Sequence, residues 1–211
     1  TRRERMPVQT KCVVTVTPTV IEFQCHRRVD VSNFVKLIAT CFVGLVGPLL
    51  AVAADIPKVQ EPVLYTALGQ SPDAKTVSVL GTRAKLVGEF KPLATPDDVA
   101  AVKTVFVTVG TSLKGFGAAG VNLQTEIARS EAIVKTAKAK GTYLILMHIG
   151  GEGRRDAMTN KLLDELAPHA NAFIVYEKGN GDGYFNKAAG SRPLVLTAKT
   201  VDVAKVLESL K

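Results

Sequence analysis

The feature that most constrains the fold is an alternation of short apolar runs with segments that have helical spacing. Runs rich in Val, Ile, Leu and Tyr occupy residues 62–68, 104–109, 142–149, 172–176 and 193–196, and a shorter one occupies 86–90. Such short, nearly continuous runs are typical of strands buried on both faces of a parallel sheet. We therefore expect each run to be a strand that leads into a helix.

The intervening segments carry apolar stripes at helical spacing. These stripes are Leu123, Ile127, Val134 and Ala137; Met158, Leu162, Leu163 and Leu166; and Val203, Leu207 and Leu210. Repeated strand–helix–strand units indicate right-handed crossovers. We predict one α/β domain over residues 55–211: a doubly wound, mostly parallel sheet of five or six strands with helices on both faces, in a flavodoxin-like or Rossmann-like three-layer sandwich. The order of the strands stays open.

Residues 31–54 resemble a secretory signal peptide. An apolar core over residues 37–54 follows Lys36 and closes on small residues ahead of Asp55, which is the pattern of a cleavable export signal. We predict cleavage near residue 54, a periplasmic or extracellular protein, and no stable membrane anchor after cleavage. The alternative is an anchor, since the run approaches the roughly 20 residues that span a bilayer, but Pro48 and two glycines interrupt it. A lipoprotein is a further alternative, although Thr40 precedes Cys41 where a small residue is needed.

The segment ahead of the signal peptide reads poorly as protein structure, and we interpret residues 1–30 as a mis-called or disordered leader. All three cysteines, Cys12, Cys25 and Cys41, precede Asp55. The mature chain would then lack disulfides, thiolate chemistry and cysteine metal sites.

Half of the formal net charge of +8 lies ahead of Asp55. Seven of the 27 basic and three of the 19 acidic residues precede Asp55, which leaves a surplus of four basic residues in the predicted domain. That imbalance is mild, and no basic run interleaves with aromatic residues as on nucleic-acid surfaces. We expect no nucleic-acid partner.

Four polar, glycine-rich loops follow the predicted strands, at residues 69–73, 110–120, 148–156 and 177–184. The carboxyl ends of parallel strands gather on one edge of a sheet, where ligands bind. The sequence therefore predicts a ligand site at this edge.

The first loop contains Ser71-Pro72-Asp73, which suggests a nucleophile beside a carboxylate. The chain repeats the pattern at 95–97, and both copies fit a hydroxyl N-cap, a proline at the first helical position and an acid in the first turn. We favour capping. Gln70 and the Ser71 backbone remain candidate ligand contacts, because the N–H groups at a helix start suit an anion.

The second loop contains the letters GxGxxG at residues 115–120. In a dinucleotide fold this motif follows the first strand tightly and an acid ends the second. Here it follows a later strand after five more residues, and the next strand ends in His148 and Gly150. We expect no nucleotide cofactor, and indeed none of any kind, and we interpret the glycines as allowing a long loop to fold close to the sheet. Ser112 and Lys114 are candidate ligand contacts in this loop.

The third loop places Arg154 and Arg155 just before a helix expected to begin near Asp156. Two cations at the positive end of a helix dipole are unfavourable by roughly 0.3–1 kcal/mol each, and a bound anion would reverse that sign. The alternative is that both arginines extend into solvent or pair with Glu152 and Asp156.

His148 ends a strand, where catalytic residues often project, and it is our candidate general base. It has no second histidine at metal spacing, and Glu152 lies in a loop, so we predict no metal site. Ser71 or Ser112 with His148 and Asp73 or Asp182 would supply the residue types of a serine hydrolase, but the G-x-S-x-G elbow is absent.

Segments 61–74 (EPVLYTALGQSPDA), 114–120, 147–155 (MHIGGEGRR) and 177–185 together resemble a family of exported bacterial proteins catalogued only as a domain of unknown function. The resemblance covers nearly all of residues 55–211 and supports the location of the site at the strand-end loops. It implies no catalytic residue, substrate or cofactor. This chain has Gly153 within its HIGGE-x-RR segment, and residues 1–30 have no counterpart.

Our leading hypothesis is an exported protein that binds a small anionic molecule, a carboxylate or phosphate. Arg154 and Arg155 would supply charge, and hydrogen bonds would come from Gln70, Ser71, Ser112 and His148, with Lys114 and Glu152 nearby. One rival is a hydrolase or transferase that uses His148 as its base. Another is an interaction module with a protein partner in the cell envelope.

Overall fold

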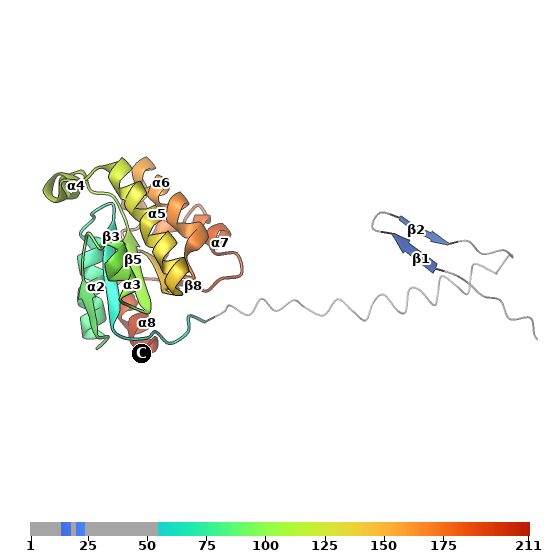
Figure 1. Ribbon diagram of the computed structural model, residues 1–211, viewed down its shortest axis with the longest axis horizontal. Helices are drawn as coiled ribbons and strands as arrows, with labels where there is room; N and C mark the ends of the chain where they lie inside the picture. The colour runs from blue at the N-terminus through green and yellow to red at the C-terminus, as the bar shows by residue number, and fades with distance from the viewer. Residues whose placement is uncertain (1–13, 18–19, 24–54) are drawn as a thin grey trace, which may run out of the picture. The chain divides into compact units, whose positions relative to one another are not determined.

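The computed structural model describes residues 14–17, 20–23 and 55–211 of the chain (Figure 1). The chain divides into two units, Thr1–Ala51 and Val52–Lys211. In the first unit, β1 (Val14–Thr17) pairs with β2 (Val20–Phe23) in antiparallel register. The predicted signal peptide at 31–54 and the rest of the predicted leader lie outside the described residues. No helix in the described ranges is both long and apolar enough to cross a membrane.

The second unit is built on one six-stranded, all-parallel sheet. The strands are β3 (Val63–Leu68), β4 (Gly88–Phe90), β5 (Thr104–Val109), β6 (Tyr143–His148), β7 (Ala172–Tyr176) and β8 (Leu194–Thr197), in the spatial order β4-β3-β5-β6-β7-β8. Each lies within two residues of its predicted bounds. β3 and β5 are buried along their whole length, because helices cover both faces of the sheet. The predicted fold class is confirmed.

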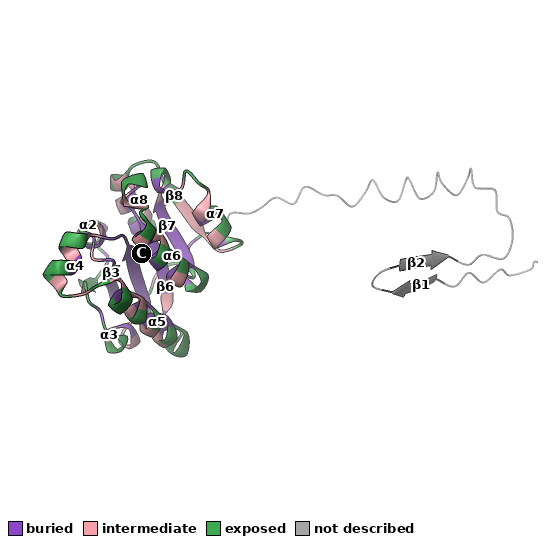
Figure 2. Cartoon of the chain, turned by 90° about the horizontal axis from the view of Figure 1, so that it is seen from above, coloured by how far each residue is buried: buried purple, intermediate pink, exposed green. Residues whose placement is uncertain are grey.

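The helices are α2 (Asp73–Arg83), α3 (Pro96–Ala100), α4 (Leu113–Ala119), α5 (Leu123–Lys140), α6 (Ala157–Leu166), α7 (Tyr184–Ala189) and α8 (Val203–Ser209), with short 3-10 turns η1 (Glu152–Arg154), η2 (Ala167–His169), η3 (Glu177–Gly179) and η4 (Thr200–Asp202). Helices α3, α5, α6 and α7 pack on one face of the sheet, while α2 and α8 pack on the other. Figure 2 shows the buried central strands between two layers of helices whose outer faces are exposed.

Successive strand residues alternate between the two cores, as the pleat of a strand requires. Leu64 and Phe173 face the layer of α3, α5, α6 and α7, whereas Tyr65, Phe106 and Ile174 face α2 and α8. The domain is thus a three-layer sandwich with two separate hydrophobic cores.

The strand order places the topological switch point between β3 and β5. From β3 the chain runs outward to β4 and then returns past β3 to β5, after which it proceeds only toward β8. The loops after β3 and β5 therefore lead to helices on opposite faces, which is where ligands bind in open α/β sheets. The sequence alone could not place this point.

The second loop differs from the prediction, because most of it is helix α4. Ser112 Oγ accepts a hydrogen bond from Gly115 N (3.1 Å) as N-cap, and Gly120 ends the helix with a φ of 66°. Two glycines within seven residues argue against a helix on propensity. The two caps and the buried Phe116 offset that cost.

The two ends of this unit meet at the amino-terminal edge of the sheet, opposite the glycine-rich loops (Figure 1). Val59 N donates a hydrogen bond to Leu210 O (2.8 Å), and Lys211 Nζ donates to Lys85 O (2.8 Å). The carboxyl-terminal edge is left to the four loops.

Candidate functional site

The loops after β3 and β5 are joined to each other beyond the ends of their strands. Ser112 N donates to Gly69 O (2.9 Å), Ser71 N donates to Gly110 O (3.1 Å), and Gln70 forms a bridge with Thr111. Gly69 has a φ of 91°, and a Cβ there would lie 2.4 Å from Gly110 O. The switch point is therefore one fixed backbone unit.

Side-chain capping explains the hydroxyl-Pro-Asp pattern at α3 but not at α2, whose N-cap is Pro72 without a side-chain cap hydrogen bond. Thr95 forms a full capping box with Asp98 at the start of α3. Ser71 Oγ accepts from Asp73 N (3.1 Å) at the start of α2. Asp73 Oδ2 is a buried atom without a hydrogen-bond partner among the described residues, and it lies 3.8 Å from Arg154 Nε.

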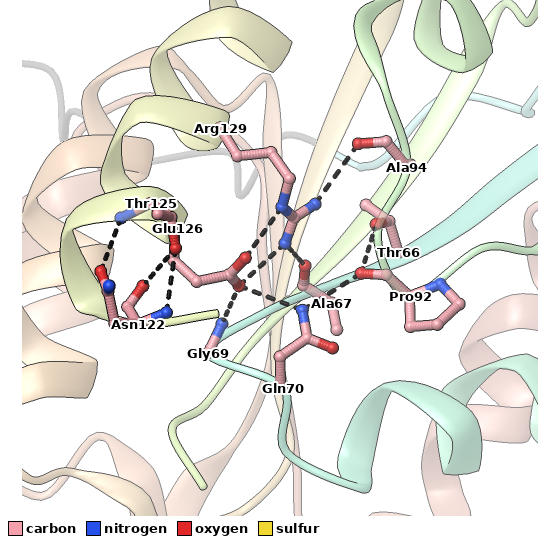
Figure 3. A network of polar contacts seen from close by, with 10 residues as sticks. All are labelled: Thr66, Ala67, Gly69, Gln70, Pro92, Ala94, Asn122, Thr125, Glu126 and Arg129. Carbon is pink, nitrogen blue, oxygen red and sulfur yellow. Dashed lines mark hydrogen bonds and ion pairs between the residues drawn. The ribbon is translucent and has the colours of Figure 1, made fainter. Parts of the chain in front are cut away.

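A buried ion pair that sequence reasoning missed lies beneath this unit (Figure 3). The side chain of Glu126, from α5, has no exposed surface. Its Oε2 accepts from Gly69 N (2.7 Å), Gln70 Nε2 (3.1 Å) and Arg129 Nη2 (2.8 Å), and its Oε1 accepts from Arg129 Nε (2.9 Å). The carboxylate thus connects α5 to the loop after β3.

The remaining donors of this network also point at the protein. Arg129 donates to Ala67 O and to Ala94 O (3.5 Å). Gln70 Nε2 donates to Pro92 O (3.3 Å) in addition to Glu126. Both donors of the Gln70 amide are therefore engaged, so this predicted ligand contact can offer a ligand only its amide oxygen.

A signal for Glu126 was present in the sequence. Positions 123, 126, 130, 133 and 137 of α5 alternate in steps of three and four, which is the spacing of one helix face. Glu126, Ser130, Ile133 and Ala137 are buried on that face. A glutamate within such a stripe indicates a buried charge with a partner.

Arg154 stands beside the switch point. Its Nη1 donates to Thr111 O (3.0 Å), and Thr111 is itself fixed by Asp156 Oδ2, which accepts from its hydroxyl (2.6 Å), and by Thr159 Oγ1, which accepts from its amide (2.9 Å). Within the described part of the chain, Nε and Nη2 of Arg154 donate no hydrogen bond, and the side chain is 33% exposed. Gly150 allows this approach, because a Cβ there would lie 2.2 Å from Arg154 Cγ.

Arg155 points elsewhere and is fully engaged. Its Nε donates to Asn160 Oδ1 (2.8 Å), its Nη1 to Gly179 O (2.5 Å) and its Nη2 to Asp182 Oδ2 (2.9 Å). The guanidinium stacks on Tyr184 at 4.9 Å from the ring centroid. The two arginines therefore do not act as a pair. Their carboxylate partners are Asp73 and Asp182 rather than the expected Glu152 and Asp156.

Asp156 has a different task, because it is the N-cap of α6, where its Oδ1 accepts from Thr159 N (2.7 Å). The helix therefore begins at the predicted position. The Asp156 carboxylate balances part of the positive charge that the arginines bring to this end of the helix.

His148 is buried below the third loop and stacks on Phe185 with a centroid distance of 5.5 Å. Its Nδ1 lies 3.0 Å from Val109 O, and its Nε2 lies 3.2 Å from Gly151 O. Burial lowers the pKa of His148, against the opposing effect of these two carbonyl groups. Both ring nitrogens face backbone acceptors, so the ring offers no free nitrogen to a substrate.

The other predicted residues lie apart from the switch point. Lys114 is exposed on α4. Glu152 lines a polar hollow of about 440 Å³ at the carboxyl ends of β6 and β7, together with Arg155, Asn160, Lys178, Gly179, Gly181 and Asp182. The structure thus brings Gln70, Ser71, Ser112 and Arg154 together, and it separates Lys114, Glu152 and Arg155 from them.

The glycines of the GxGxxG letters belong to helix α4 and its C-cap. The first glycine of the motif, Gly115, packs α4 against the first loop, because a Cβ there would lie 2.1 Å from Gln70 O. The motif is part of a helix rather than a turn that wraps a phosphate. In the described residues, no three His, Cys, Asp or Glu side chains are grouped so that they could hold a metal ion.

Comparison with known proteins identifies one family. The model of the domain of unknown function DUF6305 matches residues 60–210, which span the whole sheet and all of its helices. Searches of curated proteins and of solved structures give no match.

Proposed function

We propose that this chain, which belongs to the DUF6305 family of domains of unknown function, binds a small carboxylate or phosphate at the switch point beside Arg154. The observation that carries the proposal is the state of the Arg154 guanidinium. It is fixed at one nitrogen by a backbone carbonyl group, while Nε and Nη2 donate no hydrogen bond within residues 55–211. A guanidinium held in this way presents a fork that suits two oxygens of one anion.

The other partly buried arginines of the domain have no such free donors. Arg129 and Arg155 use all three guanidinium nitrogens on protein acceptors. So does Arg192, which donates to the carbonyl groups of four alanines near the ends of α6 and α7. Arg154 thus differs from these three, because two of its guanidinium nitrogens, Nε and Nη2, donate no hydrogen bond within residues 55–211.

The neighbours of Arg154 offer further polar contacts to a ligand. Asp73 Oδ2, at 3.8 Å, lies beyond hydrogen-bond distance of Nε, so an anion competes with a loosely paired carboxylate. Ser112 Oγ accepts from Gly115 N and keeps its proton to donate to a ligand. Gln70 adds its amide oxygen, as an acceptor for a hydroxyl or protonated group.

Calorimetric titration of the full chain with a panel of carboxylates and phosphates tests this proposal. Arg154→Ala should weaken binding about 10- to 100-fold, since a hydrogen bond to a charged group contributes about 1.5–3 kcal/mol. Arg83→Ala removes an exposed arginine at the end of α2 and serves as the control. The proposal is refuted if no anion binds, or if Arg154→Ala binds as tightly as the parent.

The surroundings of His148 give the hydrolase alternative no support, because a general base needs a lone pair within reach of the substrate. Turnover of chromogenic esters or phosphates that disappears in His148→Ala and survives in Arg154→Ala would reverse this preference.

We further propose that the protein is exported, on the basis of the apolar stretch at 37–54 and the small residues that end it. Mass spectrometry of the protein recovered from its native host should find a new amino terminus near Asp55. Recovery of a chain that still carries residues 31–54 would contradict the proposal.

A further inference from the structure

We infer that Glu126, held by Arg129, is a positioning residue for the anion site: it fixes the loop after β3 and, through that loop, the carbonyl group that orients Arg154. The part of this inference that concerns binding rests on the proposed function. The part that concerns the loop does not.

Glu126 contacts the loop after β3 directly. One carboxylate oxygen, Oε2, receives the backbone amide of Gly69 and the side-chain amide of Gln70. Gln70 has a φ of 56°, in the left-handed region that a residue other than glycine adopts only when its surroundings hold it there. The contacts to Glu126 and to Pro92 supply that restraint (Figure 3).

Hydrogen bonds connect the loop after β3 to Arg154. Gly69 O accepts from Ser112 N (2.9 Å), and Gln70 bridges Thr111. Thr111 O in turn accepts from Arg154 Nη1 (3.0 Å). Three consecutive links of backbone and side chain thus join a carboxylate on α5 to the guanidinium at the edge of the site.

The ion pair of Glu126 and Arg129 supplies hydrogen-bond partners that an apolar pair would lack. Replacing a buried ion pair by apolar residues of similar size is often neutral or stabilising, so stability alone gives no reason for Glu126 and Arg129. A carboxylate provides what an apolar side chain cannot, namely acceptors for the loop donors on one side and for the guanidinium on the other. Glutamine would not do, because in either orientation its NH2 group would face N–H donors that now meet Oε1 or Oε2.

The test compares Glu126→Gln with Ile133→Ala in the full chain. Ile133 is fully buried in the hydrophobic core two turns further along α5, so Ile133→Ala lowers global stability while leaving the hydrogen bonds of Glu126 in place. Amide hydrogen exchange at residues 69–71, corrected for global stability, should be about 10- to 100-fold faster in Glu126→Gln, which loses a hydrogen bond to a charged group. It should be unchanged in Ile133→Ala. Titrations with inorganic phosphate and with acetate should show a parallel loss of affinity in Glu126→Gln alone.

The outcomes separate the two proposals. Equal exchange at 69–71 in both variants overturns the inference. Faster exchange with unaltered affinity for the anion overturns the link to the site. If the parent protein binds neither phosphate nor acetate, the proposed function loses its support, while faster exchange in Glu126→Gln still upholds the control of the loop. If Glu126→Gln does not fold, Glu126→Leu with Arg129→Met removes both charges together and must give the same local acceleration.

Discussion

Replacing Gly81 by alanine should destabilise the protein, although the same change in a helix interior normally stabilises. Gly81 lies inside α2, where it faces the ring of Tyr65 from β3. A Cβ at this position would lie 2.1 Å from Tyr65 Oη and 2.6 Å from Cζ. The ring cannot easily retreat, because it is 3% exposed and stacks on Phe106 with a centroid distance of 5.2 Å.

The magnitude follows from two opposing effects. Alanine is favoured over glycine in a helix by about 1 kcal/mol, whereas overpacking a filled core costs about 1–3 kcal/mol. A contact as short as 2.1 Å with an immobile ring belongs at the upper end of that range. We therefore expect Gly81→Ala to lower the free energy of unfolding by about 1–2 kcal/mol.

Urea denaturation of Gly81→Ala and Gly117→Ala provides a matched comparison. Gly117 also lies within a helix, α4, but a Cβ there would meet no atom within 4 Å. Gly117→Ala should thus raise stability by about 0.5–1 kcal/mol. If Gly81→Ala is as stable as the parent or more so, the packing argument is refuted.

Tyr65→Phe extends the same experiment. The Tyr65 hydroxyl is buried without a hydrogen-bond partner in the described structure, and burial raises the pKa of Tyr65. Removal of this hydroxyl in Tyr65→Phe should raise the free energy of unfolding by about 1 kcal/mol, since an unsatisfied buried polar group lowers stability by at least that much. The loss caused by Gly81→Ala should shrink in this background, and a double-mutant cycle measures the difference.

Three further changes probe charged groups by urea denaturation. The hydrogen bond from Lys91 is the largest of the effects that lower the pKa of Asp98 to about 2, below its unfolded value near 3.9. The resulting stabilisation is present above pH 4 and fades as the pH falls to 2, so Asp98→Asn should make the free energy of unfolding depend less on pH in this range. Burial lowers the pKa of His148 below 6.5, so the unfolded chain takes up the proton first and the free energy of unfolding falls as the pH drops below 6.5. His148→Gln should reduce the slope of the free energy of unfolding against pH between pH 7 and 5, and an unchanged slope would contradict the buried neutral ring. Glu126→Ala should lower the free energy of unfolding by about 3–5 kcal/mol because it leaves the guanidinium of Arg129 without its carboxylate partner, while Glu126→Leu with Arg129→Met should lower it less. Equal losses of stability would show that the two charges are not coupled.

The local sequence pattern identified the sheet, because a strand buried on both faces is an unbroken run of apolar residues that can be recognised without knowing its neighbours in the fold. It failed where a side chain's partner lies far along the chain. Arg154 and Arg155 are neighbours in sequence, yet they reach carboxylates about 81 and 27 positions away, and only the folded sheet brings these loops together. His148 ends its strand as expected, but its burial depends on Phe185 and on a carbonyl group of the next strand over.

Helix α4 shows a different limit of sequence reasoning. Its glycines argue for a loop on local propensity, but the two caps and the burial of Phe116 favour the helix, and Gly115 lets it approach the backbone of Gln70. A tertiary contact of this kind overrides a weak local preference.

The meeting of both ends of the domain at one edge has a practical consequence. Because Val59 and Leu210 are hydrogen-bonded neighbours, a short linker could join residue 211 to residue 57, and new termini could be opened elsewhere without disturbing the sheet. Anchoring the domain to a sensor surface near residue 57 or residue 211 would turn its loop edge outward. The four loops would then face the solution, which is the orientation that a binding assay for the proposed anion requires.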